Sequence, residues 1–217
     1  MSRIRYRLLA AALAAALTPA LAAQEAPGVP AAADLQLDRS RLPERVEGIE
    51  GVEQNLFRDG RVYIGGQPSQ SALAALRELG VTAVVNLRTP AEMDDRQRVP
   101  YDEAAAVAEL GMEYIAIPLG GAEHPYTPQA VDRLARALAV RPGPVLLHCT
   151  IGWRASYLWV AYLIREQGFA LADALARGRA LALSQDPLEG LLGRALTIQF
   201  ADEARPGGAP QSSDSPR

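Results

Sequence analysis

Cysteine and histidine are scarce in this chain of 217 residues, which has one cysteine and two histidines. A single cysteine cannot form a disulfide within the chain, nor can it supply a zinc site that needs two or four thiolates. Basic residues are not in excess, because 22 lysines and arginines face 25 aspartates and glutamates. Beyond the first thirty residues no run of eighteen uncharged apolar residues occurs, which excludes a protein with several membrane-spanning helices. The apolar fraction of 49% suffices for one globular domain, and we expect no metal or cofactor.

The N-terminus has the pattern of a secretory signal peptide. Three arginines come first, at Arg3, Arg5 and Arg7. The apolar stretch 8–21 follows and ends in small residues, so we expect cleavage before Ala23. A membrane anchor is the alternative, but the stretch is shorter than the ~20 residues of a spanning helix, and Pro19 interrupts it. We therefore predict a periplasmic or secreted protein that has lost residues 1–22.

Loss of that segment leaves an acidic chain with one domain. It removes three arginines and no acids, so 19 basic residues face 25 acidic ones over 195 residues, a net charge of −6. A nucleic-acid partner therefore has no electrostatic support. Residues 23–48 are rich in proline, alanine and charge without periodicity, which predicts a linker, and 204–217 has the composition of a disordered tail. Between them we predict one domain, 49–203, in a monomeric protein.

Strand and helix patterns alternate along this domain. The β-branched run 82–87 is typical of a strand buried on both faces of a parallel sheet. Ser69 or Ser71 is the expected N-cap of the first helix, and Thr127 before a proline begins a later one. We predict strands at 61–65, 82–87, 112–118 and 145–148, and helices at 70–79, 102–110, from 128, 155–167, 171–183 and 188–200. This order predicts an α/β fold, a three-layer sandwich with helices flanking a mostly parallel central sheet of about four to five strands.

The segment 148–154, HCTIGWR, carries the main chemical signal. Cys149 stands where a buried strand ends and a helix is about to begin, the edge at which parallel sheets bind ligands. A thiol there lies near backbone N–H groups at the positive end of a helix dipole, and its usual pKa of ~8.5 can fall to about 4–7. Arg154 offers a planar fork of donors for two phosphate oxygens, and Gly152 lets the chain curl. The segment therefore predicts a nucleophilic thiolate beside an anion site.

At these residues the sequence resembles the cysteine-dependent superfamily of protein tyrosine and dual-specificity phosphatases. It is more closely similar to a bacterial branch, the phosphatase-like domain of beta-lactamase-hydrolase-like proteins. The shared motifs are GGQPS after the first strand, VVNLR followed shortly by Glu92, EYIAIPL, and a shortened HCTIGWR loop. The resemblance implies a dual-specificity-phosphatase-like fold that hydrolyses a phosphorylated protein or a small phosphoester.

The same resemblance assigns roles to the residues of the loop. Cys149 would be the nucleophile that takes up the phosphoryl group as a thiophosphate ester. Arg154 would bind the substrate and stabilise the transition state, while backbone amides of the loop hold the phosphate oxygens. The phosphate-binding residues implied in this way are Thr150, Ile151, Gly152, Trp153, Arg154 and Ser156.

Two departures from the family pattern concern the loop itself. Four residues rather than the usual five separate Cys149 from Arg154, so we expect a tighter loop. The hydroxyl residue that usually follows the arginine, and helps the thiolate leave, is replaced by Ala155. Ser156 comes next in the chain and is the candidate substitute.

A third departure concerns the general acid. The aspartate that the family places shortly after the third strand is absent from the segment 120–124, GGAEH. Glu123 and His124 are the candidates for this role, because protonation of a leaving oxygen needs only a proton donor within hydrogen-bond reach. Asp94 or Asp95, after the VVNLR strand, is a further alternative.

Two other functions fit the same loop. A rhodanese-like sulfurtransferase also places a cysteine on a short loop before a helix, where Cys149 would carry a persulfide. A pseudophosphatase would only bind phosphorylated ligands, and the absent aspartate supports it. We favour the phosphatase because the order of elements follows that family and because Arg154 suits a phosphate.

Several neighbouring residues are expected to support the loop rather than react. His148 is expected to form structural hydrogen bonds behind the loop. Arg88 and Glu92 are expected to form an ordinary loop salt bridge, with a pair that braces the site as the alternative. Tyr157 and Trp159 are two positions apart on a helix and therefore point to different faces, so at least one of them belongs to the core.

Overall fold

The structure is a computed structural model that describes residues 34–181 and 191–193. The strands are β1 (Glu44–Arg45), β2 (Leu56–Asp59), β3 (Val62–Gly65), β4 (Ala83–Asn86), β5 (Glu113–Ala116) and β6 (Val145–His148). The helices are α1 (Gln70–Glu78), α2 (Pro90–Asp94), α3 (Glu103–Glu109), α4 (Pro128–Ala139), α5 (Trp153–Arg165) and α6 (Leu171–Ala180). The sheet has the order β1-β2-β3-β6-β4-β5. The pairs β1–β2 and β2–β3 are antiparallel, and the pairs β3–β6, β6–β4 and β4–β5 are parallel.

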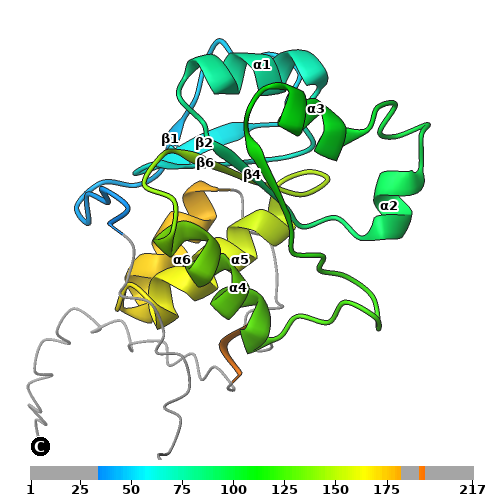
Figure 1. Cartoon of the computed structure of the whole chain (residues 1–217). Coiled ribbons are helices and arrows are strands. Elements are labelled where there is room, and N and C mark those ends of the chain that lie inside the picture. Colours follow the sequence, from blue (N-terminus) through cyan, green and yellow to red (C-terminus); the bar gives the residue numbers. More distant parts are fainter. Residues whose placement is uncertain (1–33, 182–190, 194–217) are drawn as a thin grey trace, which may run out of the picture.

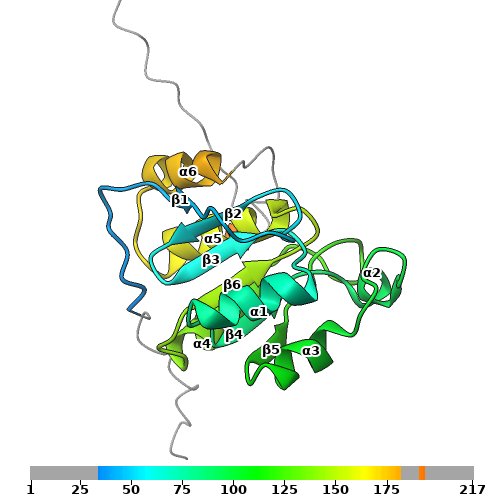
Figure 2. The same ribbon diagram turned by 90° about the horizontal axis from the view of Figure 1, so that it is seen from above.

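Helices cover both faces of this sheet. In Figure 1, α1 and α3 lie above the sheet, and α4, α5 and α6 lie below it. Figure 2, a view from above, shows α1 over the middle of the sheet and α2 outside it. The central strand β6 serves both layers, because Val145 and Leu147 join the core on the α4–α6 side while Leu146 joins the core on the α1–α3 side.

The predicted α/β fold with a mostly parallel sheet between two helical layers is confirmed. The sheet has six strands rather than four to five, because β1 and β2 add an antiparallel edge. Gly60 and Arg61 connect β2 to β3, and Gly60 has a φ of +59°, which suits a tight hairpin turn. The Asp-Gly pair at 59–60 was the available signal for this hairpin, whereas β1 is too short for a periodic pattern.

The described part of the predicted linker, 34–48, packs against the domain. Leu35 is 2% exposed and belongs to the core, and its carbonyl accepts a hydrogen bond from the Arg61 backbone N–H. The Arg61 side chain donates to the carbonyl of Asp34 at 2.9 Å. One buried leucine leaves no periodic pattern in a segment rich in proline, alanine and charge. The sequence therefore predicted a solvated segment here.

Helix caps follow the sequence in part. Ser69 is the N-cap of α1, because its hydroxyl accepts from the N–H of Ala72. Thr127 occupies the N-cap position of α4 but makes no side-chain capping bond. The helix after the cysteine begins at Trp153, two residues before the predicted start, and the short helix α2 was not predicted.

Several predictions fall on residues that the structure does not describe. The signal peptide 1–22, residues 23–33 of the linker and the tail 204–217 lie outside the described residues, as does most of the helix predicted at 188–200. Within 34–181 and 191–193, no helix is both long and apolar enough to cross a membrane.

Candidate active site

Cys149 lies at the carboxyl end of the central strand β6. Its side chain is buried, at 1% exposed, and its Sγ accepts a hydrogen bond from the backbone N–H of Gly152 at 3.2 Å. The backbone N–H of Cys149 itself donates to the carbonyl of Gly65 on β3. Gly152 is the N-cap of α5 and has a φ of +94°, a conformation that disfavours any other residue. The sulfur is thus held next to the first turn of a helix, as the sequence predicts.

The GGQPS segment holds the outer side of the cysteine loop. Gly66 forms an isolated bridge with Ile151, and the N–H of Gln67 donates to the carbonyl of Thr150 at 2.9 Å. A Cβ atom on Gly66 would lie 2.2 Å from the carbonyl oxygen of Glu53 and 2.9 Å from that of Thr150. Glycine is therefore required at 66 because two backbones meet there, which explains why this motif accompanies the loop.

Arg154, in the first turn of α5, is held by an extended set of acceptors. Its two terminal nitrogens donate to Oε1 and Oε2 of Glu92 at 2.7 and 2.8 Å, which makes a bidentate pair. They also donate to the carbonyl of Leu119 and to the hydroxyl of Thr150, both at 2.7 Å. Burial tends to lower the pKa of Arg154, but the hydrogen bonds to Glu92 and the charges of Cys149 and Glu92 raise it above its ordinary value.

Glu92 lies on α2 and is a residue whose main role sequence reasoning missed. It closes a capping box with Thr89, and it also accepts from the hydroxyl of Thr150 at 3.0 Å. Burial opposes its charge, yet the hydrogen bonds from Arg154 and Thr89 lower its pKa from 4.5 to about 2. The predicted partner Arg88 is 3.8 Å away, so Glu92 braces Arg154 more closely than it braces Arg88.

His148 stands behind the cysteine, as expected, and has a buried acidic partner. Nε2 of the imidazole lies 2.7 Å from Oε1 of Glu103, the first residue of α3, and neither side chain is exposed. Nδ1 lies 3.3 Å from the carbonyl oxygen of Cys149. No sequence pattern connects Glu103 to the loop, because it stands in the first turn of a helix in another part of the chain.

The candidate acids Glu123 and His124 line a surface depression that is separate from the cavity beside the cysteine loop. Glu123 and His124 border it together with Asp94 and the start of α2, and the side chain of Glu123 is exposed. The same loop approaches the arginine through Gly120, where a Cβ atom would lie 3.5 Å from a terminal nitrogen of Arg154.

Tyr126, further along that loop, is half-buried and was not singled out by the sequence. Burial raises the pKa of its hydroxyl, the charge of Arg154 opposes this rise, and the charge of Cys149 adds to it. The motifs GGQPS, VVNLR, EYIAIPL and HCTIGWR do not include this tyrosine, and an aromatic residue two positions after a candidate acid carries no signal by itself.

Ser156 and the aromatic residues of α5 occupy the inner side of the helix. The Ser156 hydroxyl is shared between the carbonyls of Gly152 at 3.0 Å and Leu181 at 3.2 Å. The prediction that Tyr157 or Trp159 is a core residue is confirmed for both, since they are 6% and 0% exposed. Trp153 is the exception, with 45% of its surface exposed beside the loop.

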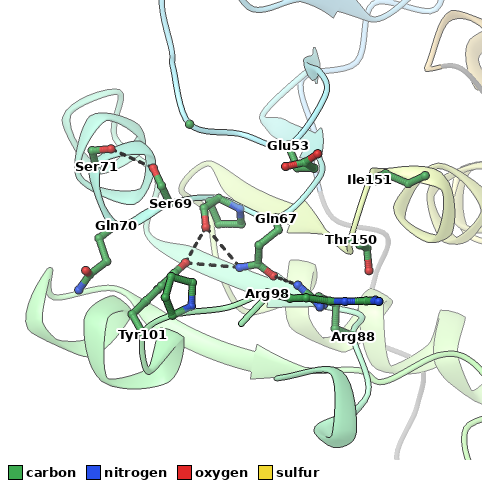
Figure 3. Close-up of a pocket in the computed structure, with 13 residues that line it drawn as sticks. Glu53, Gln67, Ser69, Gln70, Ser71, Arg88, Arg98, Tyr101, Thr150 and Ile151 are labelled. Carbon is green, nitrogen blue, oxygen red and sulfur yellow. Dashed lines mark hydrogen bonds between the residues drawn. The ribbon is translucent and has the colours of Figure 1, made fainter. Parts of the chain in front are cut away.

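A cavity of about 830 Å³ adjoins the cysteine loop through Thr150 and Ile151. Figure 3 shows Gln67 in its wall, with bonds that join it to Tyr101 and Arg88. This volume is within the range of small-molecule sites, about 300–1,000 Å³. Among residues 34–181 and 191–193 there is no group of three histidine, cysteine, aspartate or glutamate side chains that could hold a metal ion.

A comparison with family models decides the family. The model described as "DSP-PTPase phosphatase fused to NAD+ Kinase" matches residues 43–189. The chain belongs to this DSP-PTPase family. The resemblance to dual-specificity and tyrosine phosphatases is thereby confirmed, and the matched range contains the whole Cys149–Arg154 loop and Glu92.

A curated relative and two solved structures are similar to this DSP-PTPase family member. A beta-lactamase hydrolase-like protein of Xylella fastidiosa (strain Temecula1 / ATCC 700964) is 28% identical over 137 residues, which are 63% of this chain and 30% of the relative. The chain therefore spans about a third of the length of that relative. A putative phosphatase (DUF442) from Shewanella putrefaciens CN-32 has a similar fold, with a TM-score of 0.52 at 24% identity, covering 67% of this chain and 92% of that one. Tk-PTP in its active form gives the same TM-score and identity over 63% of this chain and 95% of its own.

Proposed function

We propose that this DSP-PTPase family member hydrolyses phosphoesters through a phosphocysteine on Cys149, with Arg154 as the ligand of the phosphate. The observation that carries the proposal is the fixed arginine. A bidentate carboxylate pair and two further acceptors aim the Arg154 guanidinium at the loop whose first residue is the thiol. A planar fork held in this way suits a phosphate with two oxygens to bind, whereas a persulfide sulfur does not need it.

The reaction would take place in two displacements. In the first, the Cys149 thiolate attacks phosphorus, an S–P bond forms, and the P–O bond to the leaving group breaks as its oxygen receives a proton. In the second, water attacks phosphorus and gives a proton to the group that protonated the leaving oxygen, the S–P bond breaks, and inorganic phosphate leaves while the sulfur returns to the thiolate. The backbone N–H of Gly152, which contacts Sγ, stabilises the negative sulfur in the free enzyme and after each turnover.

Arg154 would bind the phosphate without giving up its brace. Its terminal nitrogens hold Glu92, Leu119 and Thr150, while its Nε–H has no hydrogen-bond partner among the described residues. The N–H now given to the Thr150 hydroxyl and the Nε–H lie on one edge of the guanidinium, and this edge suits two phosphate oxygens. Glu92 keeps its bonds on the other side, so the orientation of the fork is preserved through the reaction.

The leaving group is proposed to be the remainder of a phosphorylated protein or of a small phosphoester. The cavity beside Thr150 and Ile151 supports this, because it adjoins the loop and its walls combine polar side chains with Pro68, Pro100 and Tyr101. We also propose that the mature protein begins at Ala23 and acts in the periplasm or outside the cell, which the mass of the protein isolated from those fractions would test.

A paired assay of the purified protein tests the proposed function. One arm measures phosphate released from an aryl phosphate, and the other measures thiocyanate formed from thiosulfate and cyanide. We expect phosphate release only, and its loss in Cys149→Ser with vanadate binding retained, because only the sulfur chemistry is removed. Activity that survives in Cys149→Ser would refute the role of the thiol. Faster thiocyanate formation than phosphate release would establish the sulfurtransferase alternative, and vanadate binding without turnover in the wild type would establish the pseudophosphatase.

A further inference from the structure

The cavity beside the cysteine loop reaches the start of helix α1. Figure 3 shows Thr150 and Ile151 on one side of this cavity and Ser69 and Ser71 on the other. The Ser69 hydroxyl caps the third N–H of the helix. The first two, from Gln70 and Ser71, make no hydrogen bond to any described residue. Both residues line the cavity, so its wall contains two unpaired donors at the positive end of a helix dipole.

A buried arginine in the same wall also has an unused donor. The side chain of Arg88 is 1% exposed, and it lines the cavity. Its terminal nitrogens donate to Oε1 of Gln67 at 2.7 Å and to the carbonyl of Glu92 at 3.2 Å. Its Nε–H has no hydrogen-bond partner within the described residues, since Oε1 of Glu92 is 3.8 Å away. A buried cation with an unpaired donor is unfavourable, so this wall favours a negatively charged group in the cavity.

Arg98 adds a second guanidinium, from the segment between α2 and α3. Its side chain is 72% exposed, and its Nε lies 3.4 Å from Oδ2 of Asp95. Its two terminal nitrogens make no hydrogen bond to a described residue and are available to a ligand. The one acid among the described residues that line the cavity is Glu53, so two arginines face one carboxylate there. The lining therefore carries a net positive charge as well as unpaired donors.

We propose that this cavity binds a second oxyanion of the substrate, so that the protein acts on small phosphoesters whose leaving group carries another phosphate or a carboxylate. The inference deepens the proposed function and rests on it for the place of the first phosphate, at the Cys149–Arg154 loop. The second oxyanion would accept from the first N–H groups of α1 and from the guanidinium of Arg98. A volume of about 830 Å³ exceeds the needs of one phosphate and suits a leaving group with a carbon frame between the two anions. Two prolines and Tyr101 give that frame an apolar wall.

Matched phosphonate ligands test this inference by binding alone. One pair is 4-(phosphonomethyl)benzoate and its uncharged analogue 4-(phosphonomethyl)benzamide, and the 3-substituted isomers form a second pair. A P–C bond replaces the ester bond, so the ligands bind without reacting, and the members of a pair differ by one charge. Calorimetry measures the Kd of each ligand for the wild type and for Arg98→Gln at one ionic strength. We expect the wild type to bind the benzoate of at least one pair roughly fivefold to tenfold more tightly than the benzamide, and Arg98→Gln to bind the two about equally.

Arg136→Gln is the matched control. Arg136 is an exposed arginine on α4, which lies on the opposite face of the sheet from α1. Its loss changes the net charge by the same amount away from the cavity, so the preference for the benzoate should remain. A xylylene bisphosphonate distinguishes the two kinds of second anion. Tighter binding than that of the benzoate indicates a second phosphate, and weaker binding indicates a carboxylate.

The outcomes separate this inference from the proposed function. A wild type that binds none of these ligands, or that prefers the benzoate in neither pair, overturns the inference even if the protein releases phosphate from an aryl phosphate. A preference that persists undiminished in Arg98→Gln, or that disappears in Arg136→Gln, overturns it as well, because the effect would then not come from the cavity. The proposed function fails independently, if the wild type binds the phosphonates with the expected preference but hydrolyses no aryl phosphate.

Discussion

Replacement of Glu92 by glutamine is the most informative single perturbation of the site. The carboxylate accepts hydrogen bonds from both terminal nitrogens of Arg154, from Thr89 and from Thr150. An amide of the same shape has one oxygen and one NH₂ group, so a donor would replace one acceptor and face N–H or O–H groups. The Glu92→Gln variant is therefore expected to lose stability and to loosen the guanidinium.

The pKa of Glu92 sets the size and pH dependence of the loss. A carboxyl whose pKa falls from 4.5 to about 2 on folding contributes at most about 3 kcal/mol. The side chain is 29% exposed, so screening by water reduces this to about 1–2 kcal/mol. Because the folded pKa is lowered, the contribution is complete above about pH 4.5 and disappears as the pH falls towards about 2.

Urea unfolding of the wild type and of Glu92→Gln at a series of pH values measures this contribution. The free energies of unfolding should differ by about 1–2 kcal/mol near pH 7, and the difference should shrink between about pH 4.5 and pH 2. Asp94→Asn is the control, because Asp94 is an exposed acid on the same short helix. A difference that is absent at neutral pH, or that does not depend on pH, would refute the argument that the ionised Glu92 carboxylate stabilises the fold by accepting hydrogen bonds from Arg154.

Three further predictions concern other residues. Arg154→Lys should lower kcat/KM for an aryl phosphate several-fold to several-hundredfold, about 1–4 kcal/mol, because an ammonium cannot hold Glu92 and phosphate as a planar fork does; unchanged kinetics would contradict this. If Glu123 is the acid, Glu123→Gln should lower the rate of hydrolysis of alkyl phosphates ~10²-fold and that of aryl phosphates little, and His124→Gln should do the same if His124 is the acid. If neither variant differs from wild type on either ester, neither residue is the acid. Asp59→Asn should lower the free energy of unfolding by about 3 kcal/mol, because Asp59 accepts from the buried Arg177 and from Trp159, and an unshifted denaturation midpoint would be inconsistent with this.

The strands and the reactive loop were predictable because their signals are local. The β-branched run 82–87 and the segment VLLH at 145–148 became buried strands of the parallel sheet, and Ser69 capped the helix that its position indicated. Each of these features depends on a few neighbouring residues, through side-chain period, backbone conformation or a capping bond. The place of Cys149 at the end of a strand and the start of a helix follows from the same short-range signals.

The partners of the loop were decided by the tertiary structure. Glu92 is 62 positions from Arg154 in the chain. Its local pattern, Thr-Pro-Ala-Glu, predicts a capping box but does not indicate that Glu92 binds an arginine. Glu103 similarly has the sequence context of an ordinary first-turn acid, although it is buried against His148. The chain order of a parallel sheet brings such residues together at one edge, because strands that are distant in sequence end side by side. The sequence alone determines which residues can react, and the positions that the fold gives to Glu92 on α2 and to Glu103 on α3 determine which charges surround them.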